Sequence, residues 1–100
     1  MVLQVIPEAL AATSVAVEAL AERLAAAQAT VAPIITAVVP PAIDPVSIET
    51  ATVFSTQSSQ HLLVSTQGTQ QLNYAGLGVA NAGTNYALTD SHAAATMLKM

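Results

Sequence analysis

The sequence predicts an all-α protein: an antiparallel hairpin of two helices that needs two more helices from another chain to complete a four-helix bundle. Three observations predict this fold. Apolar residues recur at alternating three- and four-residue spacing in both halves of the chain. A proline-rich stretch, VVPPAIDPVS at residues 38–47, separates the two halves. No segment keeps the period-two alternation of a β-strand between turn signals, although valine and threonine locally favour strands.

The composition indicates a single domain with a thin core. One hundred residues form one domain at most. Apolar residues make up 53% of the chain, but alanine supplies about two fifths of them, and there are one Phe, two Tyr and no Trp. Burying a methyl group contributes about 0.8 kcal/mol and burying Leu, Ile or Val about 1.5–3 kcal/mol, whereas ordering the backbone of one residue costs about 1–2 kcal/mol. Such a chain gains stability by packing its apolar faces against another chain.

The first helix is expected over about residues 7–37. Pro7 suits the first helical turn, where its missing N–H needs no partner, and Glu8 lies at the positive end of the helix dipole. Glu22 and Arg23 lie off the apolar seam. Pro33 is expected to kink or end the helix, with about one further turn after it. The seam itself consists of Leu10, Thr13, Val17, Leu20, Leu24, Ala27 and Val31.

A turn is expected over about residues 38–44 and a second helix over about residues 45–84. Asp44 can cap that helix, Pro45 fits its first position, and Glu49 adds a favourable early charge. Ser, Thr and Gln make its seam less apolar than that of the first helix. A C-terminal tail is expected over residues 85–100. The seam runs through Val46, Thr50, Val53, Gln57, His61, Val64, Gly68, Leu72, Ala75, Val79 and Ala82.

Three glycines near the end of the second helix admit two interpretations. Gly76, Gly78 and Gly83 each weaken the helix by up to about 1 kcal/mol relative to alanine. They either let another helix approach closely or mark a fraying helix end. The pairing of two helices also leaves apolar residues facing outward, Leu62, Leu63 and Phe54 among them.

The charges argue against several functions. The net charge is −4 and the only basic residues are Arg23 and Lys99, so no nucleic-acid-binding surface is expected. Cysteine is absent, which excludes disulfides and thiolate metal sites. His61 and His92 lie far apart in the sequence, without the three or four converging ligands that zinc requires. No local pattern supplies a nucleophile with its base, and GLGVAN only approaches the dinucleotide fingerprint. We expect neither a cofactor nor an enzymatic activity.

The N-terminus predicts no conventional signal peptide. It lacks a basic region, and Glu8 interrupts the apolar stretch that such a peptide needs. Leu24 to Ile43 is apolar over about the length of a bilayer span, but prolines divide it and Gln28 lies inside it. A transmembrane helix is not expected.

Tyr86 and Asp90 form a candidate recognition feature. They lie four residues apart, so on a helix they project from the same face and place an aromatic ring beside a carboxylate. Asp90 is the only acid after Glu49. A chance match at this spacing is a fair alternative when Tyr86 and Asp90 are taken alone.

Taken together, three motifs resemble the PE family of mycobacterial proteins. They are Pro7-Glu8 followed by ALAATSVAVEALAERLAAA, the central VVPPAIDPVS, and Tyr86-x-x-x-Asp90. The resemblance covers nearly the whole chain, so we expect residues 1–100 to be a single PE domain without a glycine-rich extension. The segments ITAVVPPA and DPVS are most similar to those of the family branch that is encoded with the type VII secretion system linked to iron and zinc acquisition.

The resemblance implies a partner and a route of export. PE proteins of this form pair with a PPE-family protein, and the bundle is recognised by a type VII secretion system. Tyr86 and Asp90 match the family's Y-x-x-x-D/E secretion signal. A cytosolic chaperone contacts the PPE subunit, and the PE chain has no known catalytic role. The protein is therefore expected to be secreted or held at the cell surface or envelope. The residues expected to contact the partner are Leu10, Val17, Leu20, Leu24, Val53, Phe54, Val64 and Leu72.

One departure and two alternatives stay open. The segment STQSSQHLLVSTQGTQQLNY at residues 55–74 is more polar than is usual in the family, which leaves the identity of the PPE partner open. The first alternative is an amphipathic hairpin that binds a membrane or envelope surface, although such helices usually carry Lys or Arg on the polar face. The second is a small helical protein that associates with itself.

Overall fold

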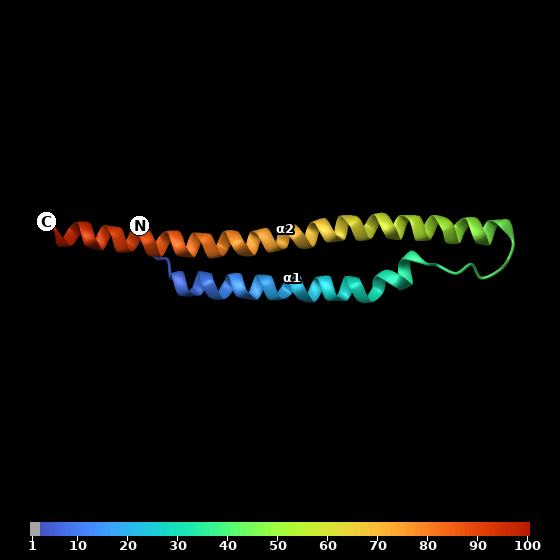
Figure 1. Ribbon diagram of the computed structural model, residues 1–100, viewed down its shortest axis with the longest axis horizontal. Coiled ribbons are helices and arrows are strands. Elements are labelled where there is room, and N and C mark those ends of the chain that lie inside the picture. Colours follow the sequence, from blue (N-terminus) through green and yellow to red (C-terminus); the bar gives the residue numbers. More distant parts are fainter. Residues whose placement is uncertain (1–2) are drawn as a thin grey trace. The chain divides into compact units, whose positions relative to one another are not determined.

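The computed structural model describes residues 3–100, and all the regular structure in them is α-helical. Helix α1 spans Pro7–Thr36 and helix α2 spans Pro45–Leu98, and residues 37–44 join them (Figure 1). The two helices pack against each other as a hairpin, which confirms the all-α hairpin predicted from the sequence. Residues 3–20 and 72–100 belong to one compact unit, here called the terminal unit, and residues 21–71 form a second, here called the turn unit.

The ends of α1 follow from its two prolines. The helix begins at Pro7, and the carbonyl oxygen of Ile6, just before it, accepts the N–H of Ala9 at 3.0 Å. The helix then continues through Pro33 and ends at Thr36, three residues later. Proline lacks the N–H of an intrahelical hydrogen bond and its ring crowds the carbonyl four residues back. The helix therefore ends within one turn of Pro33.

Asp44 caps the start of α2. Its Oδ1 accepts the backbone N–H of Ser47 at 2.9 Å, and its Oδ2 accepts the Ser47 hydroxyl at 2.8 Å. The Asp44 carbonyl oxygen accepts the N–H of Ile48 at 3.1 Å. The bond from the Ser47 N–H, followed by the bond from its hydroxyl, stabilises the carboxylate and lowers the pKa of Asp44 from its ordinary value. The break at the central prolines is thus followed at once by a capped helix.

The capping contribution of Asp44 is expected to depend on pH. Because the folded pKa lies below the ordinary value of 3.8, this contribution is complete above that value and is lost as the pH falls through the folded pKa. Asp44→Asn keeps a capping acceptor but does not titrate. Circular-dichroism melts from about pH 6 to about pH 2 should show the Tm of the unsubstituted protein falling relative to that of Asp44→Asn in acid. Parallel curves throughout would contradict the role of the ionised carboxylate.

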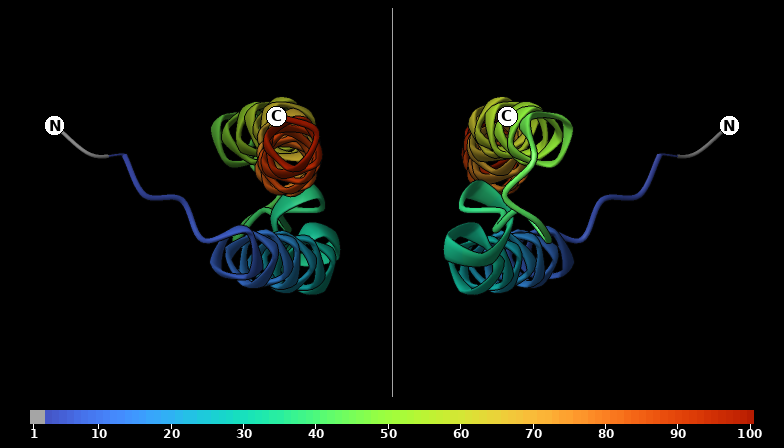
Figure 2. Two further views of the ribbon diagram at one scale, coloured as in Figure 1. Left: turned by 90° about the vertical axis from the view of Figure 1, so that its left-hand side faces the viewer. Right: turned by 90° about the vertical axis from the view of Figure 1, so that its right-hand side faces the viewer.

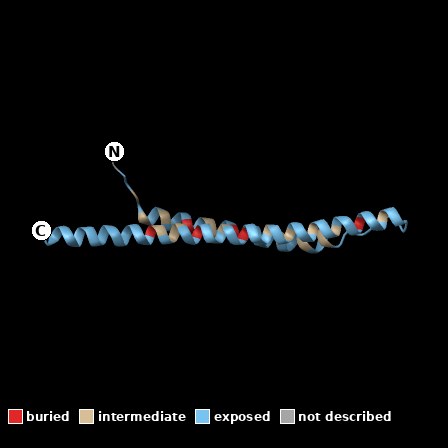
Figure 3. Cartoon of the chain, turned by 90° about the horizontal axis from the view of Figure 1, so that it is seen from above, coloured by how far each residue is buried: buried red, intermediate tan, exposed pale blue. Residues whose placement is uncertain are grey.

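Helix α2 is longer than the sequence predicted. We expected it to end near residue 84, with a tail over 85–100, but it continues to Leu98. The added residues include Ala93, Ala94 and Ala95, which are the strongest helix formers, and the preceding glycines together weaken the helix by only a few kcal/mol. Within the terminal unit, α2 runs past the start of α1 (Figure 1), and every residue from 84 to 100 is exposed (Figure 3).

Glycine and serine form the closest contact between the helices in the terminal unit. Ser14 is buried, and its hydroxyl donates to the carbonyl oxygen of Gly76 at 2.8 Å. A Cβ added at Gly83 would lie 3.2 Å from the Cβ of Leu10 and 3.3 Å from the carbonyl oxygen of Pro7. Gly76 and Gly83 therefore allow close approach of α1, which decides between the two interpretations for these two residues.

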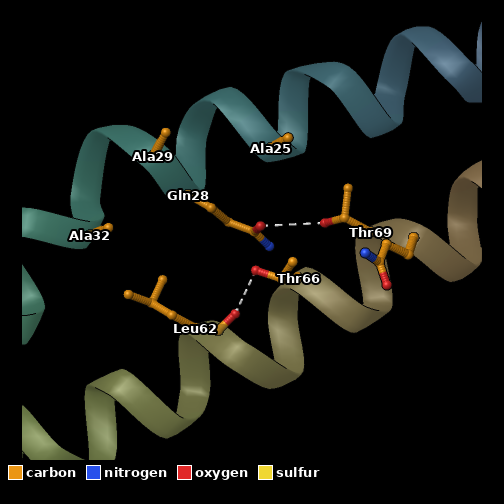
Figure 4. A pocket seen from close by; sticks show the side chains of 8 residues that line it. Ala25, Gln28, Ala29, Ala32, Leu62, Thr66 and Thr69 are labelled. Carbon is orange, nitrogen blue, oxygen red and sulfur yellow. Dashed lines mark hydrogen bonds between the residues drawn. The ribbon is translucent and has the colours of Figure 1, made fainter.

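Polar residues also join the helices in the turn unit. Figure 4 shows Gln28 of α1 pointing toward Thr69 of α2, whose buried hydroxyl lies 3.3 Å from the Gln28 Oε1 and 3.0 Å from the carbonyl oxygen of Ser65. The Gln28 amide donates to that same carbonyl oxygen at 3.4 Å. Ala21 and Ala51 are the buried hydrophobic residues of this unit. The polar Gln28 that interrupted the apolar run is thus satisfied by hydrogen bonds.

The buried seam differs from the one predicted. On α2 the buried or half-buried positions are small or polar at almost every step, and they lie one residue away from many of the predicted apolar positions. Leu20 and Val64, both placed on the predicted seam, are exposed. Small side chains let the helix backbones approach closely, so the contact selects Ser, Thr, Gly and Ala and turns larger side chains outward. The α2 positions are Ser47, Ala51, Ser55, Ser58, Leu62, Ser65, Thr69, Leu72, Gly76, Val79, Ala80, Ala82 and Gly83.

Candidate functional site

Tyr86 and Asp90 lie on the same face of α2, in the terminal unit. Because α2 continues to Leu98, both residues are helical, and their spacing of four places them one turn apart. The Tyr86 side chain is 42% exposed, and Asp90 is also exposed. Neither residue belongs to the seam between the helices. Both are therefore accessible without any change in the packing of the hairpin.

The segment before α1 completes a groove at these two residues. Residues 3–6 have no helical structure, and Figure 2 shows them leaving the start of α1 and running away from both helices. Where they leave α1, they border an open groove of about 450 Å³ together with side chains on α2. The lining residues are Leu3, Gln4, Val5, Ile6, Tyr86 and Asp90. On the other side, Tyr86 lines a groove of about 320 Å³ with Ala82, Asn85 and Thr89.

Pro7 and Glu8 lie in the same unit of the structure as Tyr86 and Asp90. They line a groove of about 510 Å³ that Gly83 and Ala87 of α2 also border. The close approach of the Pro7 carbonyl oxygen to Gly83 fixes the point at which residues 3–6 leave α1. The two motifs, taken separately from opposite ends of the sequence, thus meet in one unit of the structure.

Residues 3–6 were not predicted to belong to this site. The prediction would have required the register in which α1 pairs with α2. Once Pro7 lies against Gly83, an antiparallel hairpin carries residues before Pro7 toward α2 positions after Gly83, where Tyr86 and Asp90 lie. Nothing in the composition of LQVI marks it as a groove wall.

The residues expected to contact a partner fall into two sets. Leu10, Val17 and Leu72 are half-buried in the contact between α1 and α2. The other five are exposed, including Leu20 at 53% and Phe54 at 60%. These five large apolar side chains are available to another molecule. They are Leu20, Leu24, Val53, Phe54 and Val64.

The described part of the chain presents exposed apolar and polar side chains to another molecule. Within residues 3–100, no three His, Cys, Asp or Glu side chains gather closely enough to hold a metal ion. Neither helix has, over these residues, a stretch long and apolar enough to cross a membrane. The hairpin presents the Tyr86 ring and the Asp90 carboxylate beside the apolar residues of the segment 3–6. It also carries exposed apolar side chains elsewhere.

Known proteins resemble the chain over nearly its full length. The sequence matches the PE family model over residues 3–93. It is 56% identical over 96 residues to "PE family immunomodulator PE5" of Mycobacterium tuberculosis, which covers 96% of this chain and 94% of the relative. It is 49% identical over 98 residues to "PE family immunomodulator PE15", found in two strains of the same species, which covers 98% of this chain and 96% of the relative.

Proposed function

The chain belongs to the PE family, and from this premise we propose that it is a non-enzymatic export partner. It forms a one-to-one heterodimer with a PPE-family protein, whose two helices complete a four-helix bundle. The pair leaves the cell through a type VII secretion system, for which Tyr86 and Asp90 are the signal. A cytosolic chaperone acts through the PPE subunit, and the protein reaches the envelope, the cell surface or the medium.

The observation that carries this proposal is the distribution of apolar side chains. Among residues 3–100 the only buried hydrophobic residues are Ala21 and Ala51, and no large side chain is fully buried. Fully burying one Leu, Ile or Phe contributes about 1.5–3 kcal/mol, and this chain leaves many such residues in water. A second pair of helices that covers Leu20, Leu24 and Phe54 would recover that free energy.

Charge on this face is expected to prevent pairing. Leu20→Glu places a carboxylate where the proposed partner packs, so co-purification with a co-expressed PPE protein should fall at least tenfold, for a loss of about 2 kcal/mol or more. Arg23→Gln is the control for charge, because it also lowers the net charge by one without placing a carboxylate among apolar side chains. Equal recovery of the two complexes would contradict the proposed interface. A chain that melts cooperatively alone and stays monomeric beside its partner would contradict the heterodimer itself.

Two alternatives have their own tests. A hairpin that binds a membrane or envelope surface through its exposed apolar residues would float with liposomes when purified alone, whereas the proposed PE subunit stays in the soluble fraction with its partner. A self-associating helical protein would sediment as a defined homo-oligomer. The exposed apolar residues suit all three states, and family membership favours the heterodimer.

The names of the relatives support a role after export. Proteins 49–56% identical to this chain are called immunomodulators, and we extend this role to the exported chain. Macrophages exposed to strains that secrete the chain and to strains that retain it through a signal substitution should differ in cytokine release. Identical responses would contradict this second role without affecting the proposed export.

A further inference from the structure

The groove beside Tyr86 has three kinds of wall. Leu3, Val5 and Ile6 supply apolar surface, and Gln4 adds an amide. On the α2 side the walls are the Tyr86 ring and the Asp90 carboxylate. Its volume of about 450 Å³ is larger than one side chain needs, so a residue of another protein can enter while water remains around its end. An open groove with apolar residues on one side and a single carboxylate on the other limits the chemistry of the occupant.

The residues that line the groove include one acid and no base. Asp90 is the only acid among residues 50–100. In that range Lys99 is the only lysine or arginine, and the two histidines are His61 and His92, the latter two residues after Asp90. Lys99 lies nine residues beyond Asp90, just past the end of α2 at Leu98. The groove is therefore acidic and accessible, in a chain whose net charge is −4.

A side chain with an apolar stem and a cationic end fits these walls. The methylene groups of arginine or lysine pack on apolar residues while the charged group stays hydrated. A cation over a tyrosine ring is attracted by the negative face of the ring, and a guanidinium also pairs with a carboxylate through two parallel hydrogen bonds. A wholly apolar side chain would leave Asp90 unpaired, and an acidic one would be repelled by it.

We propose that the groove formed by residues 3–6, Tyr86 and Asp90 binds an arginine or lysine side chain of the export machinery. The inference rests on the proposed function, because it assigns a ligand to the same signal. It adds residues 3–6 to the signal as an apolar wall. The recognition element is then a composite of both ends of the chain, assembled only when α1 pairs with α2.

The first test measures binding directly. The isotope-labelled chain, purified in complex with its co-expressed PPE protein, is titrated with acetyl-Ala-Arg-Ala-amide. A second titration uses the same peptide carrying citrulline, which has nearly the shape of arginine but no charge. We expect amide shifts at residues 3–6 and around Tyr86 and Asp90 with the arginine peptide, with a dissociation constant on the order of 1 mM. These shifts should be absent with citrulline and in Asp90→Asn. No localised shifts, or equal shifts with both peptides, would overturn the proposal.

The second test separates the groove from the signal in cells. The double variant Leu3→Ser and Val5→Ser removes apolar wall before α1 begins, so the hairpin stays intact, which circular dichroism checks. Export should fall about tenfold, whereas Leu98→Ser, which removes an apolar side chain 88% exposed and outside the groove, should export normally. Normal export of the double variant together with poor export of Tyr86→Ala overturns the groove alone. Normal export of Tyr86→Ala overturns the proposed function as well.

Discussion

Replacing Tyr86 with alanine is expected to lower export at least tenfold while pairing with the PPE protein stays intact. The reason is the position of the side chain. Tyr86 is exposed on α2 and outside the seam, so its loss removes nothing from the contact between the helices. Truncating an aromatic side chain at the centre of a recognition site commonly costs about 2 kcal/mol or more, which corresponds to about a thirtyfold weaker interaction. Asp90→Asn should act in the same direction, whereas Asp90→Glu keeps the charge and should keep export.

The chain contains matched controls for both residues. Tyr74 is the second tyrosine, lies on the same helix and is 63% exposed, so Tyr74→Ala removes an equivalent ring outside the signal. Glu49→Gln removes an exposed carboxylate near the other end of α2. Export is measured as the ratio of protein in the medium to protein in the cells, and pairing by co-purification from the cells. If Tyr86→Ala and Tyr74→Ala are exported equally, the assignment of the signal is wrong. If Tyr86→Ala also loses its partner, the residue acts in pairing instead.

The hairpin could be predicted because its determinants are local. Pro7 and Pro45 occupy the first positions of the two helices, and Pro33 ends the first within a turn. Asp44 caps the second helix through bonds to the nearby Ser47. Each effect acts within a few residues of its cause, so the sequence contains it directly. The pair Tyr86 and Asp90 is local in the same sense, because four residues on a helix fix one shared face.

The contact between the helices could not be predicted because its determinants are not local. Apolar spacing indicates which side of a helix avoids water. This chain has two candidate surfaces, an inner one between the helices and an outer one that carries the larger apolar side chains. The inner surface is built from Ser14, Gly76 and Thr69, whose buried polar groups are satisfied across the contact or within the helix. The larger side chains, such as Leu20, face outward. The rule that the largest apolar residues lie inside therefore gives the wrong contact surface here.

The register of the hairpin also sets where residues 3–6 lie relative to Tyr86 and Asp90, which makes Gly83 a sensitive position. Gly83→Leu is expected to lower the stability of the hairpin, because even the first added carbon would lie 3.2 Å from the Leu10 Cβ and 3.3 Å from the Pro7 carbonyl oxygen. Both neighbours belong to or adjoin the backbone of α1, so the helix itself would have to move. Overpacking of this kind costs about 1–3 kcal/mol or more, against a gain of about 0.8 kcal/mol in helix propensity.

A substitution at Gly78, in the same helix, is expected to raise the stability of the hairpin instead of lowering it. A Cβ added there meets nothing within 4 Å, so Gly78→Ala should gain helix propensity, about 1 kcal/mol, without a clash. A change of 1 kcal/mol moves the Tm of a domain of this size by about 4–8 °C, so melts of the purified complex should shift downward for Gly83→Leu and upward for Gly78→Ala. Export should fall for Gly83→Leu alone, because displacing Pro7 carries residues 3–6 away from Tyr86. Shifts of the same sign at both glycines would mean that α1 does not approach α2 at Gly83.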